Sequence, residues 1–117
     1  MDQSTFLSYC MDKPGAEQSL RQEWQANQVK VGEVMFAMTH EMDGKPVISL
    51  KSSPEMAASL RAEYRSIVPC GLLNKNHWNT LFLDGDIPDS QIYYLADASW
   101  QLAVETLPDT LRQELNI

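Results

Sequence analysis

Residues 73–80 read LNKNHWNT and place a lysine, a histidine, a tryptophan and three asparagines between apolar flanks. A lysine can neutralise a phosphate, asparagine and histidine can hydrogen-bond a sugar or a base edge, and an aromatic ring can stack on a base. The candidate binding residues in this stretch are Asn74, Lys75, Asn76 and His77. Trp78 alternates with Thr80 and Phe82, which favours a core position over a stacking surface.

The charge pattern along the chain points to the same region. The 117 residues carry a net charge of −7, which argues against a nucleic-acid partner because phosphate binding draws on a basic surface. Residues 45–78, however, hold five basic side chains against two acidic ones, whereas residues 1–44 hold three against seven and residues 79–117 one against seven. The cations expected to meet on one surface with the candidate segment are Lys51, Arg61, Arg65 and Lys75.

Enzymatic chemistry finds little support in the sequence. Cys70, His77 and Asp84 would supply a nucleophile, a base and an orienting acid, but such a set is recognised by its geometry and the spacing alone carries almost no information. No Walker A, G-x-S-x-G or G-x-G-x-x-G motif is present. We therefore expect a non-enzymatic protein with no catalytic residues and no cofactor.

Metal binding also lacks a recognisable pattern. His40 and His77 form neither H-x-x-x-H nor H-E-x-x-H, so we expect no metal site. The carboxylates of Asp84, Asp86 and Asp89 could attract a hard cation, but turn and helix-capping roles explain them more simply.

The absence of certain sequence features predicts the cellular compartment of the protein and the state of its cysteine thiols. No stretch approaches the roughly 20 apolar residues that span a bilayer, and the N-terminus MDQSTFLSYC lacks the features of a secretory signal, so we expect a cytoplasmic protein. Cys10 and Cys70 belong to no paired framework, which favours two reduced thiols in or near the core. A disulfide and a catalytic thiol are the alternatives.

The elements that must position these residues begin with a short helix. Apolar residues repeat at helical spacing over 6–11, and Lys13-Pro14-Gly15 ends the run. Loose alternation predicts two short strands, one over residues 20–24 and one over 28–31.

The clearest local pattern is EVMFAMTH (33–40), followed by Asp43-Gly44 and KPVISLK (45–51). Two extended segments around an Asp-Gly turn are typical of a β-hairpin, because glycine tolerates positive φ. A two-residue turn places Ala37 opposite Leu50 on an apolar face. The other face would carry Phe36, Met38, His40 and Lys51.

The second half of the chain alternates helix, strand and helix. Ser53-Pro54 predicts the start of a helix of about three turns, with Arg61 and Arg65 on its flank. WNTLFL (78–83) predicts a strand, and a helix follows from about Pro88 to Leu107. The order helix, strands, helix, strands, helix predicts one α+β domain over residues 1–117, with an antiparallel sheet of five to six strands covered by helices.

Four parts of this sequence follow a recognisable pattern, and they are KPGAEQS (13–19), KVGEVMFAM (30–38) with VISLKSSPE (47–55), VPCGLLNKNHWNTLFLDGDIPD (68–89) and ASW (98–100). Together they resemble the MmcQ/YjbR family of small bacterial proteins. The most specific parts are L-N-K-x-H-W (73–78) and L-K-x-x-P-E (50–55). The resemblance implies a single α/β domain of "double wing" type, related to frataxin-like and secretion-chaperone-like folds and usually labelled DNA-binding. Residues at the family's characteristic places are Lys51, Asn74, Lys75, His77 and Trp78.

Two functions from different classes are expected in order of weight. In the first, the hairpin wing and residues 73–78 approach double-stranded DNA, with Lys51, Arg61, Arg65 and Lys75 on phosphates and Asn74, Asn76 and His77 beside sugars or base edges. In the second, an apolar sheet face and acidic helices hold a protein partner in a chaperone-like manner. An enzyme without a known motif is a third alternative, which a perturbed Cys70 beside His77 would favour. We expect no membrane partner, and a monomer or weak dimer.

Overall fold

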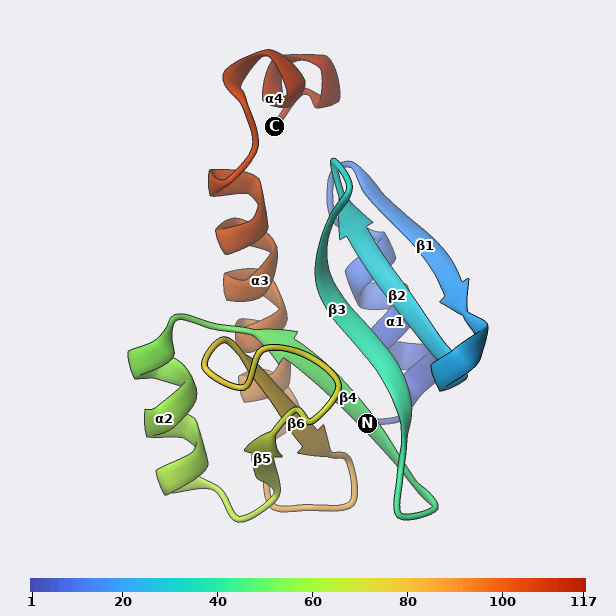
Figure 1. The fold of residues 1–117 in the computed structure, drawn as a ribbon, viewed down its shortest axis with the longest axis vertical. Coiled ribbons are helices and arrows are strands. Elements are labelled where there is room, and N and C mark those ends of the chain that lie inside the picture. Colours follow the sequence, from blue (N-terminus) through green and yellow to red (C-terminus); the bar gives the residue numbers. More distant parts are fainter.

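Helices and antiparallel strands alternate along the chain, and the computed structural model describes all 117 residues (Figure 1). The elements are α1 (Gln3–Met11), β1 (Ala16–Arg21), the 3-10 turn η1 (Gln22–Trp24), β2 (Ala26–Val31), β3 (Val34–Met42), β4 (Lys45–Lys51), α2 (Pro54–Glu63), β5 (Ile67–Pro69), β6 (Trp78–Phe82), α3 (Asp89–Glu105) and α4 (Asp109–Leu115). None of the helices has the length and apolar character needed to cross a bilayer.

All six strands belong to one sheet, in which every neighbouring pair is antiparallel. The strand order is β1-β2-β3-β4-β6-β5, so β6 inserts between β4 and β5. Helix α2 lies between β4 and β5 in the chain, and α3 and α4 follow the last strand. The predicted α+β domain with an antiparallel sheet of five to six strands and covering helices is confirmed.

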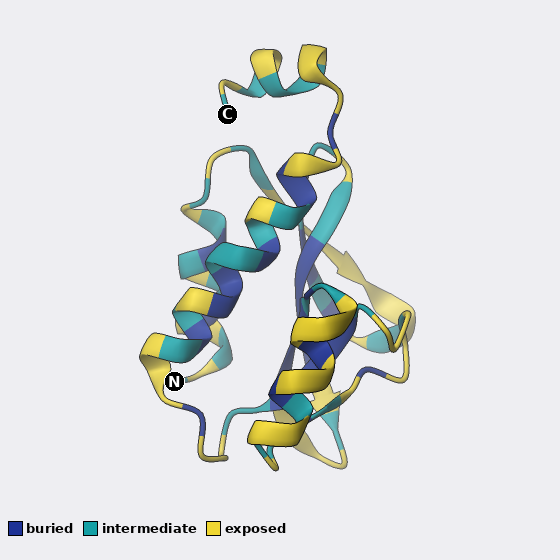
Figure 2. Cartoon of the chain, turned by 90° about the vertical axis from the view of Figure 1, so that its left-hand side faces the viewer, coloured by how far each residue is buried: buried dark blue, intermediate teal, exposed yellow.

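Helices α1 and α3 cover one face of the sheet and lie behind it in Figure 1. The main core of 18 buried residues forms here, with Phe6 of α1, Ile48 of β4 and Leu95 of α3 among its members. Helix α2 packs beside β5 and β6 and adds Leu60 to the same core. Figure 2 shows the buried residues where the helices face the sheet and the exposed residues on their outer sides.

The opposite face of the sheet is covered in part by the loop that joins β5 to β6, which crosses in front of the strands in Figure 1. A second, smaller cluster of buried residues forms on this side, and its members are Ala26, Met38, Cys70 and Trp78. This loop contains the 73–77 part of the candidate segment. The segment is therefore fixed to the sheet by apolar packing at both of its ends.

The β3–β4 hairpin has the predicted register, with Ala37 opposite Leu50. Asp43 and Gly44 adopt positive φ angles of 53° and 75°, as a two-residue type I′ turn requires at both central positions. The turn chemistry of two residues thus sets which side chains of β3 and β4 face the helices.

Phe36 departs from the predicted alternation, because it lies in the main core together with its neighbour Ala37. The register between β2 and β3 shifts between Val29 and Lys30. Such a bulge adds a residue on one strand and interrupts the strict up-and-down order of side chains. The prediction that Phe36 shares a face with Met38 is therefore wrong.

The helix ends follow their capping residues. Ser53 Oγ accepts a hydrogen bond of 3.2 Å from the Met56 N–H, with Pro54 in the first turn of α2, as the sequence predicted. Helix α1 begins at Gln3, earlier than predicted, because the Asp2 carboxylate accepts from the Thr5 N–H at 2.7 Å.

The strand predicted over residues 20–24 is wrong in its second half. Strand β1 ends at Arg21, residues 22–24 form η1, and Gln25 follows at a φ of 50°. Strand β5 has only three residues, too few to show a periodic pattern.

Candidate nucleic-acid-binding surface

The loop between β5 and β6 is held by backbone hydrogen bonds at both ends. Cys70 N–H donates to Trp78 O at 3.0 Å, and Ser52 N–H donates to His77 O at 2.7 Å. The second bond joins the end of the loop to the connection between β4 and α2. The loop therefore has a fixed position relative to the helix that carries Arg61.

Asn74 builds the turn within this loop. Its carbonyl oxygen accepts from the N–H groups of His77 at 3.1 Å and Trp78 at 2.9 Å, and its side-chain Oδ1 accepts from Asn76 N–H at 3.0 Å. An asparagine that bonds the backbone two residues on is a common turn device. Asn74 thus has a structural role, which leaves only its amide N–H groups for a ligand.

The side chains of Asn76 and His77 differ from that of Trp78 in exposure. Asn76 is exposed and His77 is partly exposed, and neither side chain hydrogen-bonds to the protein. Trp78 retains 7% of its exposure and packs in the second buried cluster. The expectation that Trp78 is a core residue is confirmed.

Arg61 connects three elements through one nitrogen. Its Nη1 donates to Asn79 Oδ1 at 2.7 Å and to Lys75 O at 3.3 Å. Asn79 in turn donates from Nδ2 to Ala57 O of α2 at 3.1 Å. Helix α2, strand β6 and the loop are joined in this way, and the Arg61 guanidinium lies beside the backbone of Lys75.

Asn79 is a residue that the sequence interpretation missed. It is 1% exposed and occupies the same phase of β6 as the core residue Leu81. A polar residue at an inward position of a strand was the available signal, since buried polar groups need hydrogen-bond partners.

Lys51 and Arg65 flank this arrangement. Lys51 is the last residue of β4 and pairs with Trp78 across the sheet. Helix α2 ends at Glu63, and Arg65 is exposed in the connection that follows. The prediction that Arg65 lies on the flank of this helix is therefore wrong. The Lys51 backbone N–H donates to Ser99 Oγ of α3 at 3.0 Å, which fixes the point from which its side chain extends.

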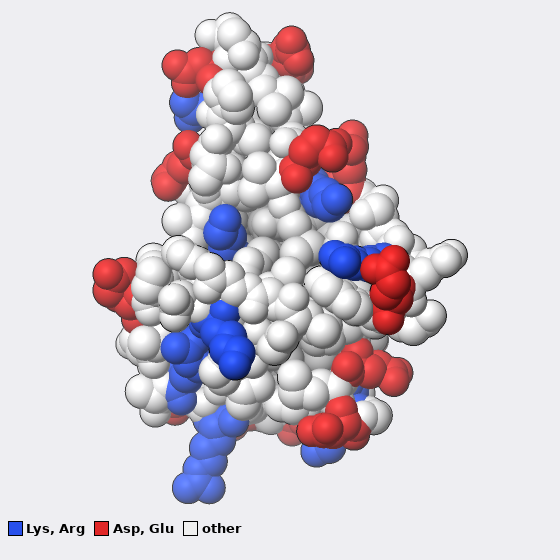
Figure 3. All heavy atoms as spheres, viewed as in Figure 1, with Lys and Arg blue, Asp and Glu red and all other residues white.

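Ion pairs divide the basic residues into two groups. Lys13, Arg21, Lys45 and Arg112 each pair with a carboxylate. No carboxylate lies within ion-pair distance of the other five, which are Lys30, Lys51, Arg61, Arg65 and Lys75. Figure 3 shows basic side chains gathered over α2 and the β5–β6 loop, with acidic side chains along the rim of the same view.

The residues considered for nucleophilic chemistry do not come together. No hydrogen bond joins His77 to Cys70 or to Asp84, and Asp84 pairs instead with Lys45 at 3.2 Å. Both cysteines are free and buried, which excludes the disulfide alternative in this structure. Burial raises the pKa of the Cys10 thiol to about 12.

The other carboxylates of the predicted turn have separate partners. Asp86 accepts from Ser66 Oγ at 2.7 Å, and Asp89 lies in the first turn of α3, 3.5 Å from the N-terminal ammonium group. No group of three or more histidine, cysteine, aspartate or glutamate side chains is arranged to hold a metal ion.

A buried polar chain lies beneath the loop and was not predicted. His40 Nε2 is 2.9 Å from Ser49 Oγ, which is 2.8 Å from Thr80 Oγ1 and 3.6 Å from Cys70 Sγ. The chain crosses three neighbouring strands. Burial lowers the pKa of the His40 imidazole below its ordinary value, so the neutral ring is favoured in the folded protein.

Comparison with known proteins identifies the family. The sequence model of the YjbR family matches residues 11–102, and this chain belongs to that family. It is 54% identical over 112 residues to the uncharacterized protein YjbR of Escherichia coli K12, covering 96% of this chain and 95% of that protein. It is 33% identical over 78 residues to the uncharacterized protein YbdF of Escherichia coli O157:H7, covering 67% and 64% of the two chains.

Solved structures share the fold. The Deinococcus radiodurans protein DR2400, described as a DUF419 domain, aligns with a TM-score of 0.89 and 29% identity over 99% of this chain and 88% of that one. A Pseudomonas syringae protein aligns with a TM-score of 0.76 and 25% identity over 88% of this chain and 99% of that one. The resemblance to the YjbR family is thereby confirmed, and these names assign no activity.

Proposed function

We propose that this protein is non-enzymatic and binds double-stranded DNA weakly through a basic surface on α2 and the connection after it, the end of β4 and the β5–β6 loop. The phosphate-binding residues of this basic surface are Lys51, Arg61, Arg65 and Lys75. Asn74, Asn76 and His77 would lie beside sugars or base edges. The protein would act in the cytoplasm as a monomer or weak dimer.

The observation that carries this proposal is the distribution of unpaired cations. Four of the five basic residues without a carboxylate partner belong to the basic surface, whereas the cations elsewhere are mostly paired. An unpaired cation can release counterions from DNA without first breaking an ion pair. The hydrogen bonds from Arg61 to Asn79 and to the Lys75 carbonyl also hold the Arg61 guanidinium beside the backbone of Lys75 before binding.

The expected affinity is low and depends on salt. Four phosphate contacts give a slope of about −3.6 in a plot of log K against log salt concentration. The surrounding acidic residues of a chain with net charge −7 oppose binding further. Binding should therefore be measurable at low ionic strength and decline steeply as salt is added.

Fluorescence anisotropy with a labelled, mixed-sequence duplex at several salt concentrations tests the proposal. Lys75→Glu should weaken binding at every salt concentration and reduce the slope by roughly 1. Lys30→Glu is the matched control, because it makes the same charge change at an unpaired lysine of β2. Absence of binding at low salt, or equal effects of the two substitutions, would refute a localised DNA surface.

A second function is favoured by an apolar groove between α2 and α3. The groove has a volume of about 240 Å³, and Met56, Leu95 and Leu102 are among its lining residues. Met56 is 39% exposed, so part of its side chain is accessible to a partner at this groove. A protein-interaction module would use this groove, and Met56→Ser, which leaves the net charge unchanged, would then reduce partner binding without changing DNA affinity.

A further inference from the structure

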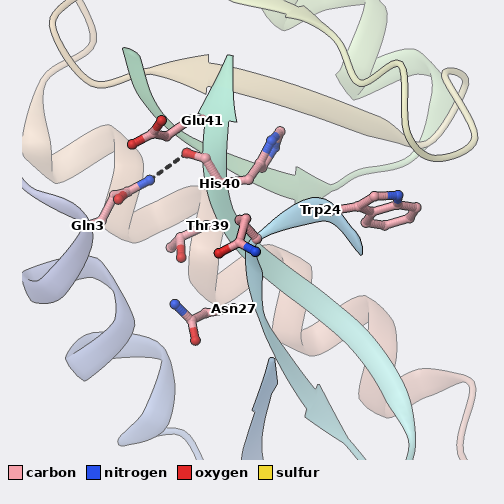
Figure 4. A pocket seen from close by; sticks show the side chains of 7 residues that line it. Gln3, Trp24, Asn27, Thr39, His40 and Glu41 are labelled. Carbon is pink, nitrogen blue, oxygen red and sulfur yellow. Dashed lines mark hydrogen bonds between the residues drawn. The ribbon is translucent and has the colours of Figure 1, made fainter. Parts of the chain in front are cut away.

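A polar pocket of about 460 Å³ opens beside the first turn of α1, at the end of β3 that precedes the hairpin turn (Figure 4). Its walls come from α1, the β1–β2 connection, the start of β2 and the end of β3. These elements are different from those of the basic surface. Side chains with unused hydrogen-bonding capacity line the pocket, and they are Gln3, Gln25, Asn27, Thr39 and Glu41.

Gln3 has a fixed orientation at this pocket. Its Nε2 donates to His40 O at 2.6 Å and to Val47 O at 2.9 Å. Both partners are carbonyl oxygens, which only accept, so the amide cannot rotate to exchange its nitrogen and oxygen. Gln3 Oε1 is consequently left as an unpaired acceptor at a defined position.

Thr39 supplies a second unused group. Its side chain is almost buried, with 3% exposure for the residue, and its hydroxyl makes no hydrogen bond to the protein. Asn27, which pairs with Thr39 across β2 and β3, uses Oδ1 to accept from Gln18 at 3.2 Å. In Figure 4 the side chains of Gln3, Thr39 and Asn27 lie close together, while the rings of Trp24 and His40 point away from them.

The charge of the pocket selects among ligands. Glu41 is the one charged residue in the lining, it is exposed, and it forms no ion pair. No lysine or arginine lines the pocket, so an anion would meet acceptor groups and a carboxylate with no cation to balance it. A ligand rich in N–H donors and carrying positive charge is complementary to this lining.

We infer that this pocket binds a small organic cation, an alkyl ammonium or guanidinium group, which donates hydrogen bonds to Gln3 Oε1, Thr39 Oγ1 and the Glu41 carboxylate. The volume lies within the range of small-molecule sites. The site is separate from DNA binding, so neither proposal depends on the other.

Titration of the ¹⁵N-labelled full chain with agmatine, a free alkyl guanidinium, tests this inference by NMR. The side-chain amide signals of Gln3, Gln25 and Asn27 should shift in a saturable manner at low salt. Glu41→Gln, at an exposed position, should weaken agmatine binding about tenfold. Thr39→Val should also weaken agmatine binding, because it removes the hydroxyl that accepts a hydrogen bond. The valine side chain has nearly the same shape as threonine, so the pocket should keep its form. Glu105→Gln on α3 is the charge-matched control and should leave binding unchanged.

Further titrations distinguish a free cation from an arginine side chain of another protein, and a cation from a polyol. Tighter binding of agmatine than of the tripeptide Gly-Arg-Gly supports a free cation, and the reverse order supports an arginine side chain of another protein. Saturable binding of myo-inositol but not of agmatine would overturn the cation in favour of a polyol. Failure of agmatine to shift the three amides, or equal binding by Glu41→Gln and Glu105→Gln, would also overturn it. Lys75→Glu should not affect agmatine binding.

Discussion

Arg61 Nη1 lies 2.7 Å from the side-chain oxygen of Asn79, a buried amide at the centre of the junction between α2, β6 and the β5–β6 loop. The other side of the Asn79 amide donates to Ala57 O. An uncharged residue, Asn79, thus positions a charged residue of the basic surface. The Asn79 amide holds the Arg61 side chain, and the same Arg61 nitrogen donates to the carbonyl of Lys75 in the loop.

Asn79→Ala should destabilise the protein by about 2 kcal/mol, because it removes two hydrogen bonds, one of them to a charged group, at a buried position. The same substitution should weaken DNA binding although the net charge is unchanged. Urea unfolding measures the first effect and fluorescence anisotropy the second.

Asn76→Ala is the control for stability, since the Asn76 side chain is exposed and makes no hydrogen bond to the protein. It should change the free energy of unfolding by less than about 0.5 kcal/mol. If Asn79→Ala were as stable as Asn76→Ala, the junction would contribute nothing to the fold.

His40 should make stability fall as the pH decreases in the range below about 6.5. Its pKa is lowered in the folded state by burial, whereas the unfolded chain keeps the ordinary value of about 6.5. As the pH falls through this window the unfolded state binds a proton before the folded state does. The stability contributed by neutral His40 is therefore complete above the unfolded pKa and is lost by at most about 1.4 kcal/mol per pH unit below it.

Urea unfolding of the wild type and His40→Gln at pH 7.5 and 5.0 measures this effect. The wild type should lose more stability than the variant between these two pH values. A variant that keeps the full pH dependence would show that another group is responsible.

The sequence predicted those parts of the fold that depend on neighbouring residues. The Asp43-Gly44 turn set the hairpin register, and Ser53-Pro54 set the start of α2. Both were predictable because turns and helix caps depend on hydrogen bonds and backbone angles of residues that are close in the sequence. The shift at Val29 and Lys30 could not be predicted, since it arises from pairing between strands. Phe36 changed faces for that reason.

The candidate site was predictable only as a set of residue types. The charge count identified Arg61 and Lys75, but the contact between them depends on Asn79, a polar residue at an inward position of β6 that the sequence interpretation missed. The His40–Ser49–Thr80 chain likewise requires the β3–β4–β6 strand order, which joins positions far apart in the sequence. The periodicity of residues within one strand does not predict which residues of neighbouring strands pair with one another.

Asp97 on α3 should make a second, more acidic contribution to the pH dependence. Burial acts to raise its pKa, but hydrogen bonds from Lys13 and from Tyr9, the latter at 2.6 Å, prevail and lower the pKa below its ordinary value. Stability from ionised Asp97 is present above the unfolded pKa of about 3.9 and is lost as the pH falls below it.

Asp97→Asn should therefore lower stability at pH 7 by no more than about 1 kcal/mol, since the carboxylate is half exposed and screened by solvent. It should also flatten the decline of stability that urea unfolding records as the pH falls below about 4. Asp109→Asn, which removes a surface ion pair with Arg112, is the matched control. An equal effect of the two substitutions would contradict a special role for the Tyr9–Asp97–Lys13 cluster.

Trp78, the first residue of β6, should contribute far more to stability than Leu72, an exposed apolar residue of the β5–β6 loop. Trp78 is 7% exposed and packs against Met38 and Cys70, whereas Leu72 is 42% exposed. Trp78→Ala should cost about 3–5 kcal/mol through lost packing and the cavity that remains, and Leu72→Ala less than about 0.5 kcal/mol. Thermal and urea unfolding compare the two variants. A folded Trp78→Ala protein with unchanged stability would mean that the indole is a surface group available to a ligand. In that case only the backbone hydrogen bonds would hold the loop to the sheet.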